Sequence, residues 1–386
     1  MFSIQHRKSF WIQFVIGTAI LIGCVLLARG AYRSLTEQGI ASGFGFLDRA
    51  TGWDVGFSLI PYTINDPYWR VILVGLLNTM FLGLIGLILA TLIGIVIGTM
   101  RISNNPVMSF LGTCYVEALR NVPLILQVFF WYAVFIHLPQ PRQAITFLGA
   151  VVLSARGIFI PGLNVAPTAA AVAGAALMAG IVLGLVFALL PRRSLAAREV
   201  LPKLAHAGLI GGIVVAAAAL WLGRTPDMPL VQVAELRGLN FRGGIRIAPE
   251  FAALLTGMSL YGGAFIGEIV RAGFLSVGKG QVEAAQALGL GPVQVLVRVR
   301  LPLALRMALP TLTNQYVWLL KATTLGIAVG FADLFLVIST SIIQSGQTLE
   351  LLGIMMAGFL IMNNLLAAVM NFINRRIALR GNQLRL

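Results

Sequence analysis

The sequence predicts an all-α fold, that of a polytopic helical membrane protein. Hydrophobic residues make up 58% of its 386 residues, charged residues make up only 11%, and the mean hydropathy is +0.91. Soluble domains carry about 25% charged residues. Several apolar runs also reach the roughly 20 residues that a helix needs to cross a bilayer. The short alternating segments of a membrane β-barrel do not stand out, so spanning helices are expected.

About eight spans are expected. The apolar runs lie at about 11–28, 71–99, 122–138, 166–190, 206–223, 250–267, 308–330 and 347–372. The first run has two interpretations, a retained span or a cleaved signal peptide. Arg29 lies inside the would-be cleavage site, which favours the retained span.

The positive charges predict the orientation of the chain. An even number of spans places both termini on one side of the membrane. If that side is the cytoplasm, the cytoplasmic segments hold 17 of the 28 Lys and Arg residues, as the positive-inside rule requires. We therefore expect both termini to be cytoplasmic. The net charge of +15 then follows topology and does not indicate a nucleic-acid partner.

Polar side chains separate two kinds of predicted span. Polar groups inside a bilayer are costly and usually face the protein interior. The spans at 166–190 and 206–223 are nearly free of them, which is typical of packing or lipid-facing helices. The candidates for interior polar positions are Asn78, Thr79, Asn314, Gln315, Lys321 and Thr323.

Two further features bear on these spans. Lys321 lies deep in its predicted span, so it either contacts a substrate, pairs with a carboxylate such as Glu268, or extends to the membrane surface. The patterns Gly94-x-x-x-Gly98 and Gly263-x-x-x-Gly267 permit close helix contact.

The stretch GKGQVEAAQALGLGPVQVLVRVRLP, from Gly278 to Pro302, differs from the apolar spans. Its first part favours a helix, and Gly289 and the Gly291-Pro292 pair interrupt it. We expect a short helix, a turn, and a second helix that enters the membrane near Pro302. One interpretation is an amphipathic interfacial helix; the other is a surface that another protein approaches closely at small residues, namely Ala284, Ala285 and Gly289.

The order of residues in this stretch resembles the signature loop of ABC-importer permeases. The matching positions are Glu283, Ala284, Ala285, Gly289 and Pro302, with Val299 where the family often has Ile. The resemblance implies that the loop forms a coupling helix that docks in a groove of a cytoplasmic ATPase.

A second segment, YVEALRNVPLILQ from Tyr115 to Gln127, is similar to one found in permeases for polar amino acids. The matching positions are Glu117, Arg120, Pro123 and Gln127. Glu117 and Arg120 are also spaced for an i, i+3 ion pair on a helix.

The resemblance covers about residues 70–375 and is to the histidine/glutamine-type permeases. It implies a five-span type I ABC importer core made of 71–99, 122–138, 250–267, 308–330 and 347–372. The layout is closest to the larger permease of broad-specificity L-amino-acid importers. Residues 1–69 would hold an N-terminal span and a periplasmic segment, 70–375 the permease domain with an inserted apolar hairpin at about 139–245, and 376–386 a cytoplasmic tail.

The same resemblance implies partners and a location. The chain contains no Walker A motif, G-x-x-x-x-G-K-[ST], so ATP and Mg would be bound by a partner ABC ATPase dimer. A second permease subunit, expected to be a paralogue, and a periplasmic amino-acid-binding protein would complete a complex in the bacterial inner membrane. The six interior polar residues are then candidates for the substrate path. Cys24 and Cys114 show no metal-ligand spacing, and no cofactor is expected.

Two alternatives remain at this stage. An ion-coupled secondary transporter often shows inverted repeats with broken helices, and no such repeat is evident. A membrane enzyme is a second alternative, but the residue types needed for catalysis are sparse in this sequence.

Overall fold

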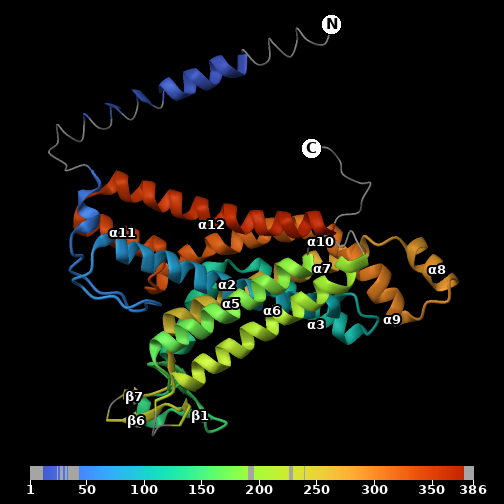
Figure 1. Cartoon of the computed structure of the whole chain (residues 1–386), viewed down its shortest axis with the longest axis horizontal. Helices are drawn as coiled ribbons and strands as arrows, with labels where there is room; N and C mark the ends of the chain where they lie inside the picture. The colour runs from blue at the N-terminus through green and yellow to red at the C-terminus, as the bar shows by residue number, and fades with distance from the viewer. Residues whose placement is uncertain are drawn as a thin grey trace. The chain divides into compact units, whose positions relative to one another are not determined.

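The computed structural model describes residues 12–23, 25–26, 29–30, 33, 43–189, 195–225, 229–238 and 240–377. Helices dominate this part of the chain (Figure 1). The longer helices are α2 (Tyr68–Arg101), α3 (Pro106–Asn121), α4 (Leu124–Ile136), α5 (Pro167–Leu189), α6 (Leu195–Leu222), α7 (Pro249–Leu275), α10 (Leu301–Lys321), α11 (Leu334–Ser345) and α12 (Thr348–Ile377). The short ones are η1 (Phe44–Asp48), η2 (Pro141–Gln143), α8 (Lys279–Ala287), α9 (Pro292–Val295), η3 (Leu296–Arg300) and η4 (Ala322–Val329).

Two compact units make up the described chain. The described residues of Met1–Ile85 and Val317–Leu366 form the first unit, and those of Gly86–Tyr316 and Ala367–Leu386 form the second. In the first unit, the stretch before α2 joins the core, because Phe46 packs edge-on against Tyr68 with 5.6 Å between ring centroids. The backbone N–H of Gly43 donates to Oε1 of Glu350 at 2.7 Å.

Most predicted spans coincide with helices. Among the described residues, α2, α7, α12 and Glu199–Leu222 of α6 are long and apolar enough to cross a membrane, and two bent helix pairs raise that total from four to six. The run at 166–190 corresponds to α5, and within the run at 11–28 the described residues Ile12–Gly23 form an apolar helix shorter than a full span. The class of fold is confirmed, and the total of eight spans stays a prediction.

Two boundaries differ from the prediction. The expected span at 308–330 begins earlier, at Leu301, and changes from α10 to the 3-10 helix η4 at Ala322. A further helix, α11, was not expected; the Asp333 side chain caps it by accepting from Leu336 N at 2.9 Å. An Asp before an apolar run is a helix-start signal, and it is present in the sequence.

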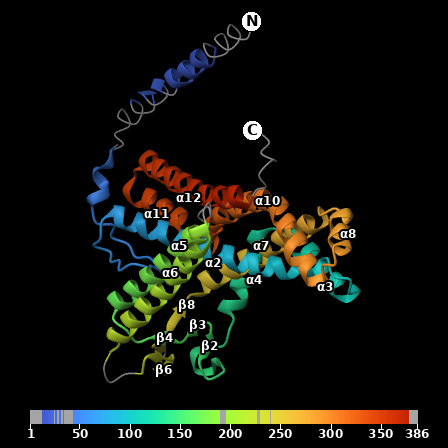
Figure 2. The same cartoon turned by 45° about the vertical axis from the view of Figure 1, so that its right-hand side comes forward.

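The inserted region is more than an apolar hairpin. Besides α5 and α6 it contains the strands β1 (Ile145–Phe147), β2 (Val151–Ser154), β3 (Gly157–Ile160), β4 (Gly162–Leu163), β5 (Val231–Gln232), β6 (Glu235–Arg237), β7 (Asn240–Arg242) and β8 (Ile245–Ile247). They form an antiparallel sheet in the order β1-β2-β3-β8 and the two pairs β4-β5 and β6-β7. Figure 2 labels β2, β3 and β8 near one another, next to the ends of the helices. Strands of two to four residues are too short to show a clear period, which is why the sequence did not predict them.

Glycines let α2 and α7 pack closely against each other in the second unit. A Cβ built on Gly94 would lie 2.5 Å from Cγ2 of Ile266, and one on Gly263 would lie 2.5 Å from Cγ2 of Ile93. Real Cβ atoms do not approach so closely, so only glycine fits at both places. The prediction that the two Gly-x-x-x-Gly patterns permit close helix contact is confirmed, since each receives a side chain of the other helix.

Candidate functional site

The segment from Gly278 to Pro302 folds as a helix, a turn and a second helix, as predicted. Helix α8 ends at Ala287, and Gly289 follows with φ +79°. Gly289 N donates to Gln286 O at 2.9 Å and Leu290 N donates to Ala285 O at 3.2 Å. These two bonds are those of a Schellman motif, which needs a left-handed residue at the position of Gly289. Gly289 is therefore needed for the backbone conformation of the turn. Pro302 lies at the start of α10.

The loop has a small core of its own. Ala285 and Val295 are only 5% and 3% exposed, because α8 packs against α9 and η3. Glu283, Ala284 and Gly289 are exposed. The hypothesis that all three small residues offer an outer surface is therefore wrong for Ala285, whose methyl group faces inward.

Exposed apolar side chains stand around this turn. Leu288 is 82% exposed, Val293 73% and Val297 53%. Sequence reasoning missed these three residues because it searched for small residues. The sequence did contain a signal, however. Large aliphatic side chains close to a glycine that ends a helix do not lie on the buried stripe of a long helix, so they can remain exposed.

The segment from Tyr115 to Gln127 contains a sharp bend between α3 and α4. Val122 is extended, with φ −98° and ψ 126°, and Pro123 precedes the first residue of α4. A proline disfavours the helical conformation of the residue before it, so α3 ends at Asn121. The axes of α3 and α4 differ by 101°.

Gln127 closes this bend from inside. It is 5% exposed, and its Nε2 donates to Leu119 O at 2.8 Å and to Val122 O at 3.0 Å. The end of a helix leaves carbonyl groups without partners, and the amide of Gln127 supplies donors to two carbonyls at this break. Gln127 therefore stabilises the bend, and α4 packs on α7.

The predicted ion pair between Glu117 and Arg120 is not among the ion pairs of the described residues. The Arg120 guanidinium instead lies over the Phe265 ring, 4.8 Å from its centroid. Glu117 is exposed and accepts from Asn121 Nδ2 at 3.4 Å. The i, i+3 hypothesis was wrong because an aromatic face on α7 is within reach of Arg120 and can stabilise its cation.

Three of the six interior polar residues support the backbone of the first unit. Asn78, Thr79 and Thr323 are fully buried. Asn78 Nδ2 donates to Phe57 O and to Ala332 O, both at 2.8 Å, and Thr79 Oγ1 accepts from Leu334 N at 2.9 Å. The first two side chains thus hold the break before α11.

The other three lie along α10. Asn314 and Lys321 are exposed and Gln315 is half-buried, with no hydrogen-bond partner for its Nε2 among the described residues. Lys321 is the last residue of α10 and forms none of the ion pairs found in the described part of the chain. Glu268, one carboxylate considered as a partner for Lys321, pairs with two arginines of its own unit.

Arg101 joins α2 to α7, whereas Arg271 lies on α7 itself, three residues after Glu268. Arg101, the last residue of α2, pairs with the Glu268 carboxylate, and Arg271 Nη2 lies 2.6 Å from Glu268 Oε1. Sequence reasoning placed Arg101 and Glu268 at the same side of the membrane without joining them.

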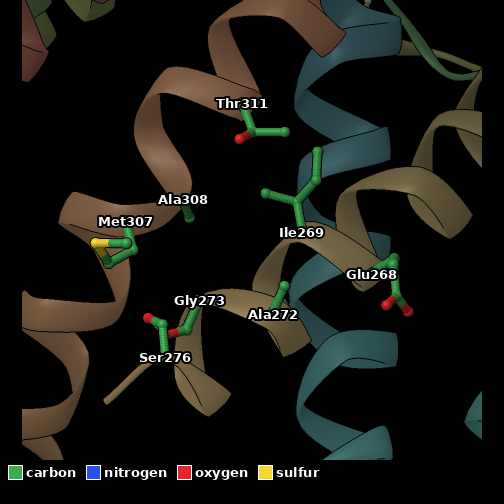
Figure 3. Close-up of a pocket in the computed structure, with 8 residues that line it drawn as sticks. All are labelled: Glu268, Ile269, Ala272, Gly273, Ser276, Met307, Ala308 and Thr311. Atoms are coloured by element: carbon green, nitrogen blue, oxygen red, sulfur yellow. Dashed lines mark hydrogen bonds between the residues drawn. The ribbon is translucent and has the colours of Figure 1, made fainter. Parts of the chain in front are cut away.

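An open cavity of about 350 Å³ lies between α7 and α10 beside this cluster. Figure 3 shows side chains of α7 on one side and of α10 on the other. Its lining residues are Glu268, Ile269, Ala272, Gly273, Ser276, Met307, Ala308 and Thr311.

Residues 180–380 match the protein family described as "Binding-protein-dependent transport system inner membrane component". This match covers just over half of the chain. The chain belongs to this family.

Several relatives are similar over nearly their whole length. The putative amino-acid ABC transporter permease protein YhdX of Escherichia coli is 36% identical over 96% of this chain and 94% of its own. The general L-amino acid transport system permease protein AapQ of Rhizobium johnstonii is 36% identical over 98% and 94%. The glutamate/glutamine/aspartate/asparagine transport system permease protein BztB of Rhodobacter capsulatus is 33% identical over 97% and 94%.

The chain is thus a multi-pass membrane component of a binding-protein-dependent transport system, a translocation subunit and not an enzyme. This confirms the resemblance to the ABC-importer permeases. It also favours that family over the secondary transporter and over the membrane enzyme.

Proposed function

We propose that this permease moves L-amino acids across the bacterial inner membrane. Three relatives with full-length similarity are named for amino-acid transport or for particular amino acids. The substrate would be handed over by a periplasmic amino-acid-binding protein. It would cross between this chain and a second permease subunit, a paralogue in our proposal.

The α8–α9 turn is the observation that carries the proposal. It holds Leu288 82% exposed and Val293 73% exposed on a loop that is rigidified by its Schellman motif and by the buried Ala285. An exposed apolar side chain on a rigid support is the kind of anchor that protein interfaces bury. With both termini cytoplasmic, this loop is cytoplasmic and docks on the ABC ATPase, which binds the ATP and Mg.

The substrate path is the second part of the proposal. Asn314 and Lys321 are the exposed polar residues of α10 among the six candidates, seven residues apart and so on one face of the helix. An amino acid carries a carboxylate, and Lys321 offers a cation to it. The permease domain in this proposal spans 70–375, with 139–245 as an insert outside the five-span core.

Two measurements test the proposed function. The chain is purified from its native membrane in mild detergent, and the proteins that accompany it are identified by mass spectrometry. We expect an ABC ATPase and a second permease. Uptake of a labelled amino acid into vesicles should then stop when the ATPase is deleted; uptake by the chain without any ATPase would contradict the proposal.

Lys321→Met tests the path, with Lys203→Met on α6 as the matched control. Lys203 is also exposed but lies outside the five-span core. We expect Lys321→Met to lower uptake at least tenfold, about 1.4 kcal/mol, while the complex still assembles. Unchanged uptake with unchanged apparent affinity would remove Lys321 from the path.

A further inference from the structure

The sheet of the insert carries apolar side chains on every position of one face. Side chains alternate between the two faces of a strand, and the register pairs Ile145 with Leu153 and Phe147 with Val151. It also pairs Leu153 with Ile158, Ile158 with Ile247 and Ile160 with Ile245. This outer face therefore consists of Ile145, Phe147, Val151, Leu153, Ile158, Ile160, Ile245 and Ile247.

The opposite face already supplies the core of the sheet. Val152 and Phe159 are 3% exposed and pack with Ala234, which comes from the other side of the insert. On the outer face none of the eight side chains is buried, and Ile145, Phe147 and Ile245 are 51%, 60% and 53% exposed. An uninterrupted apolar face of this kind on a described surface indicates something that covers it.

The β1–β2 turn extends this face. Leu148 has φ +52° and is 84% exposed, with Gly149 at φ +66° and Ala150 N donating to Phe147 O at 3.2 Å. The left-handed conformation costs a residue with a Cβ roughly 1–2 kcal/mol, and Asn or Gly would be the inexpensive choice here. The turn thus presents a leucine at the tip where a polar residue would fold more easily.

The chain places this sheet at the surface of the bilayer. Strand β8 ends at Ile247, and the spanning helix α7 begins two residues later at Pro249. The sheet and the α8–α9 loop are attached to opposite ends of this one span. The sheet is therefore joined, two residues away, to one end of a helix that is long and apolar enough to cross a membrane.

The charge around the sheet fits phospholipid. Residues 139–165 and 229–248 contain one acidic residue, Glu235, which pairs with Arg237. The basic residues of these two stretches are Arg142, Arg156, Arg237, Arg242 and Arg246. An apolar face accompanied by excess arginine is the combination that binds the interfacial region and the phosphates of a membrane.

We propose that the outer face of the β1-β2-β3-β8 sheet, with Leu148 at its tip, rests in the interfacial region of the phospholipid bilayer on the side opposite the α8–α9 loop. The apolar side chains lie among the upper acyl chains, and two exposed arginines next to the strands, Arg142 before β1 and Arg156 between β2 and β3, contact lipid phosphates. The insert then holds the outer end of α7 at a fixed depth. This inference requires only a chain that spans the membrane, so it does not depend on the substrate or on the ATPase.

The test measures which quencher reaches each face. Cys24 and Cys114 are replaced by serine, and single cysteines are placed at Phe147, at Ile245 or at Thr146 in the full chain, reconstituted in phosphatidylethanolamine–phosphatidylglycerol vesicles. Thr146 is the control, because it is exposed on the same strand but points to the opposite face. Each cysteine carries an environment-sensitive fluorophore, and quenching by lipids spin-labelled near the headgroup is compared with quenching by iodide.

We expect lipid quenching at Phe147 and Ile245 at least threefold stronger than at Thr146, and the reverse order for iodide. Equal iodide quenching at all three positions would overturn the proposal. Protection of Phe147 and Ile245 from both quenchers would also overturn it and would indicate a protein partner on this face. Phe147 lies on β1 and Ile245 lies on β8. If the cysteine variant at one position does not accumulate in the membrane, the variant at the other position still tests the proposal.

Discussion

The α3–α4 bend and the α8–α9 turn, both in the second unit, lie in the two segments whose sequences resemble permeases. They differ in whether their key side chain is buried or exposed. At the α3–α4 bend, Gln127 is buried and its amide binds two carbonyls across the break. At the α8–α9 turn, the backbone satisfies itself through Gly289, and Leu288 is left 82% exposed. At the first break the key side chain, Gln127, is hydrogen-bonded within the chain. At the second break the Leu288 side chain is left uncovered by the described residues of its loop.

This difference separates a motif that serves folding from one that serves binding. A buried polar side chain with hydrogen bonds across a break is costly to replace, because it leaves polar groups unpaired. An exposed leucine contributes little to folding, since its apolar surface stays in water. Substitutions at the two breaks should therefore change different measurements.

The largest effect is expected for Leu288→Asp. A charge in place of an apolar anchor should weaken docking by about 2 kcal/mol or more, and uptake by the assembled system should fall roughly 30-fold or further. Leu288→Met keeps volume and apolarity and serves as the control. The amount of chain in the membrane should be the same for both variants. Normal uptake by Leu288→Asp would show that the two breaks do not differ in the way described.

Gln127→Leu should act on stability. The substitution removes two part-buried hydrogen bonds, each worth about 1 kcal/mol, so the free energy of unfolding should fall by about 2 kcal/mol. The midpoint of thermal unfolding of the purified chain measures this. Gln143→Leu, at an exposed position of η2, is the control. If both variants unfold at the wild-type temperature, Gln127 does not stabilise the bend.

Gly289→Ala and Gly280→Ala form a matched pair at the second break. Both glycines are exposed, and a Cβ on either would meet nothing within 4 Å. Only Gly289 has a positive φ, so only its alanine variant should lose about 1 kcal/mol of local stability. Hydrogen–deuterium exchange of a peptide covering residues 285–295 should quicken in Gly289→Ala alone. Equal exchange in both variants would mean that the left-handed turn does not govern the loop.

The smallest effect concerns Glu117 and Arg120. The pair is spaced for an ion pair, but Arg120 lies over Phe265 instead. A double-mutant cycle with Glu117→Ala and Arg120→Ala should therefore give a coupling energy near zero in thermal unfolding. A coupling of about 0.2–0.5 kcal/mol, as an i, i+3 pair would give, would favour the sequence-based hypothesis.

The long spans and the helix–glycine–helix loop could be predicted because their signals are local. An apolar run at 71–99 has to become a helix in a bilayer, and Gly289 supplies its own conformation. The sheet could not be predicted, since β3 and β8 come from opposite ends of the insert, with α5 and α6 between them in the sequence. Side-chain direction was also beyond reach: Ala284 and Ala285 are neighbours in sequence, and only the packing of α9 decides which one faces outward.

The polar residues of the spans show the same limit. Asn78 and Lys321 were both predicted to face the interior for the same reason, the cost of a polar group in lipid. Asn78 is stabilised in the interior because its Nδ2 donates to Phe57 O and to Ala332 O. These carbonyls belong to a loop and to a helix break that are distant from Asn78 in the sequence. Lys321 stays exposed at the end of α10. The principle that predicts burial does not say which partner each side chain will find.

The docking role of the α8–α9 turn can be tested directly by photocross-linking in the native complex. A photoreactive phenylalanine analogue replaces Leu288 in one variant and Phe147, on the sheet at the other end of α7, in the control. Illumination should join the Leu288 variant to a cytoplasmic ATPase, identified by mass spectrometry, and should leave the Phe147 variant without that product. No ATPase product at Leu288, or equal yields at both positions, would contradict the assignment of this loop to the ATPase.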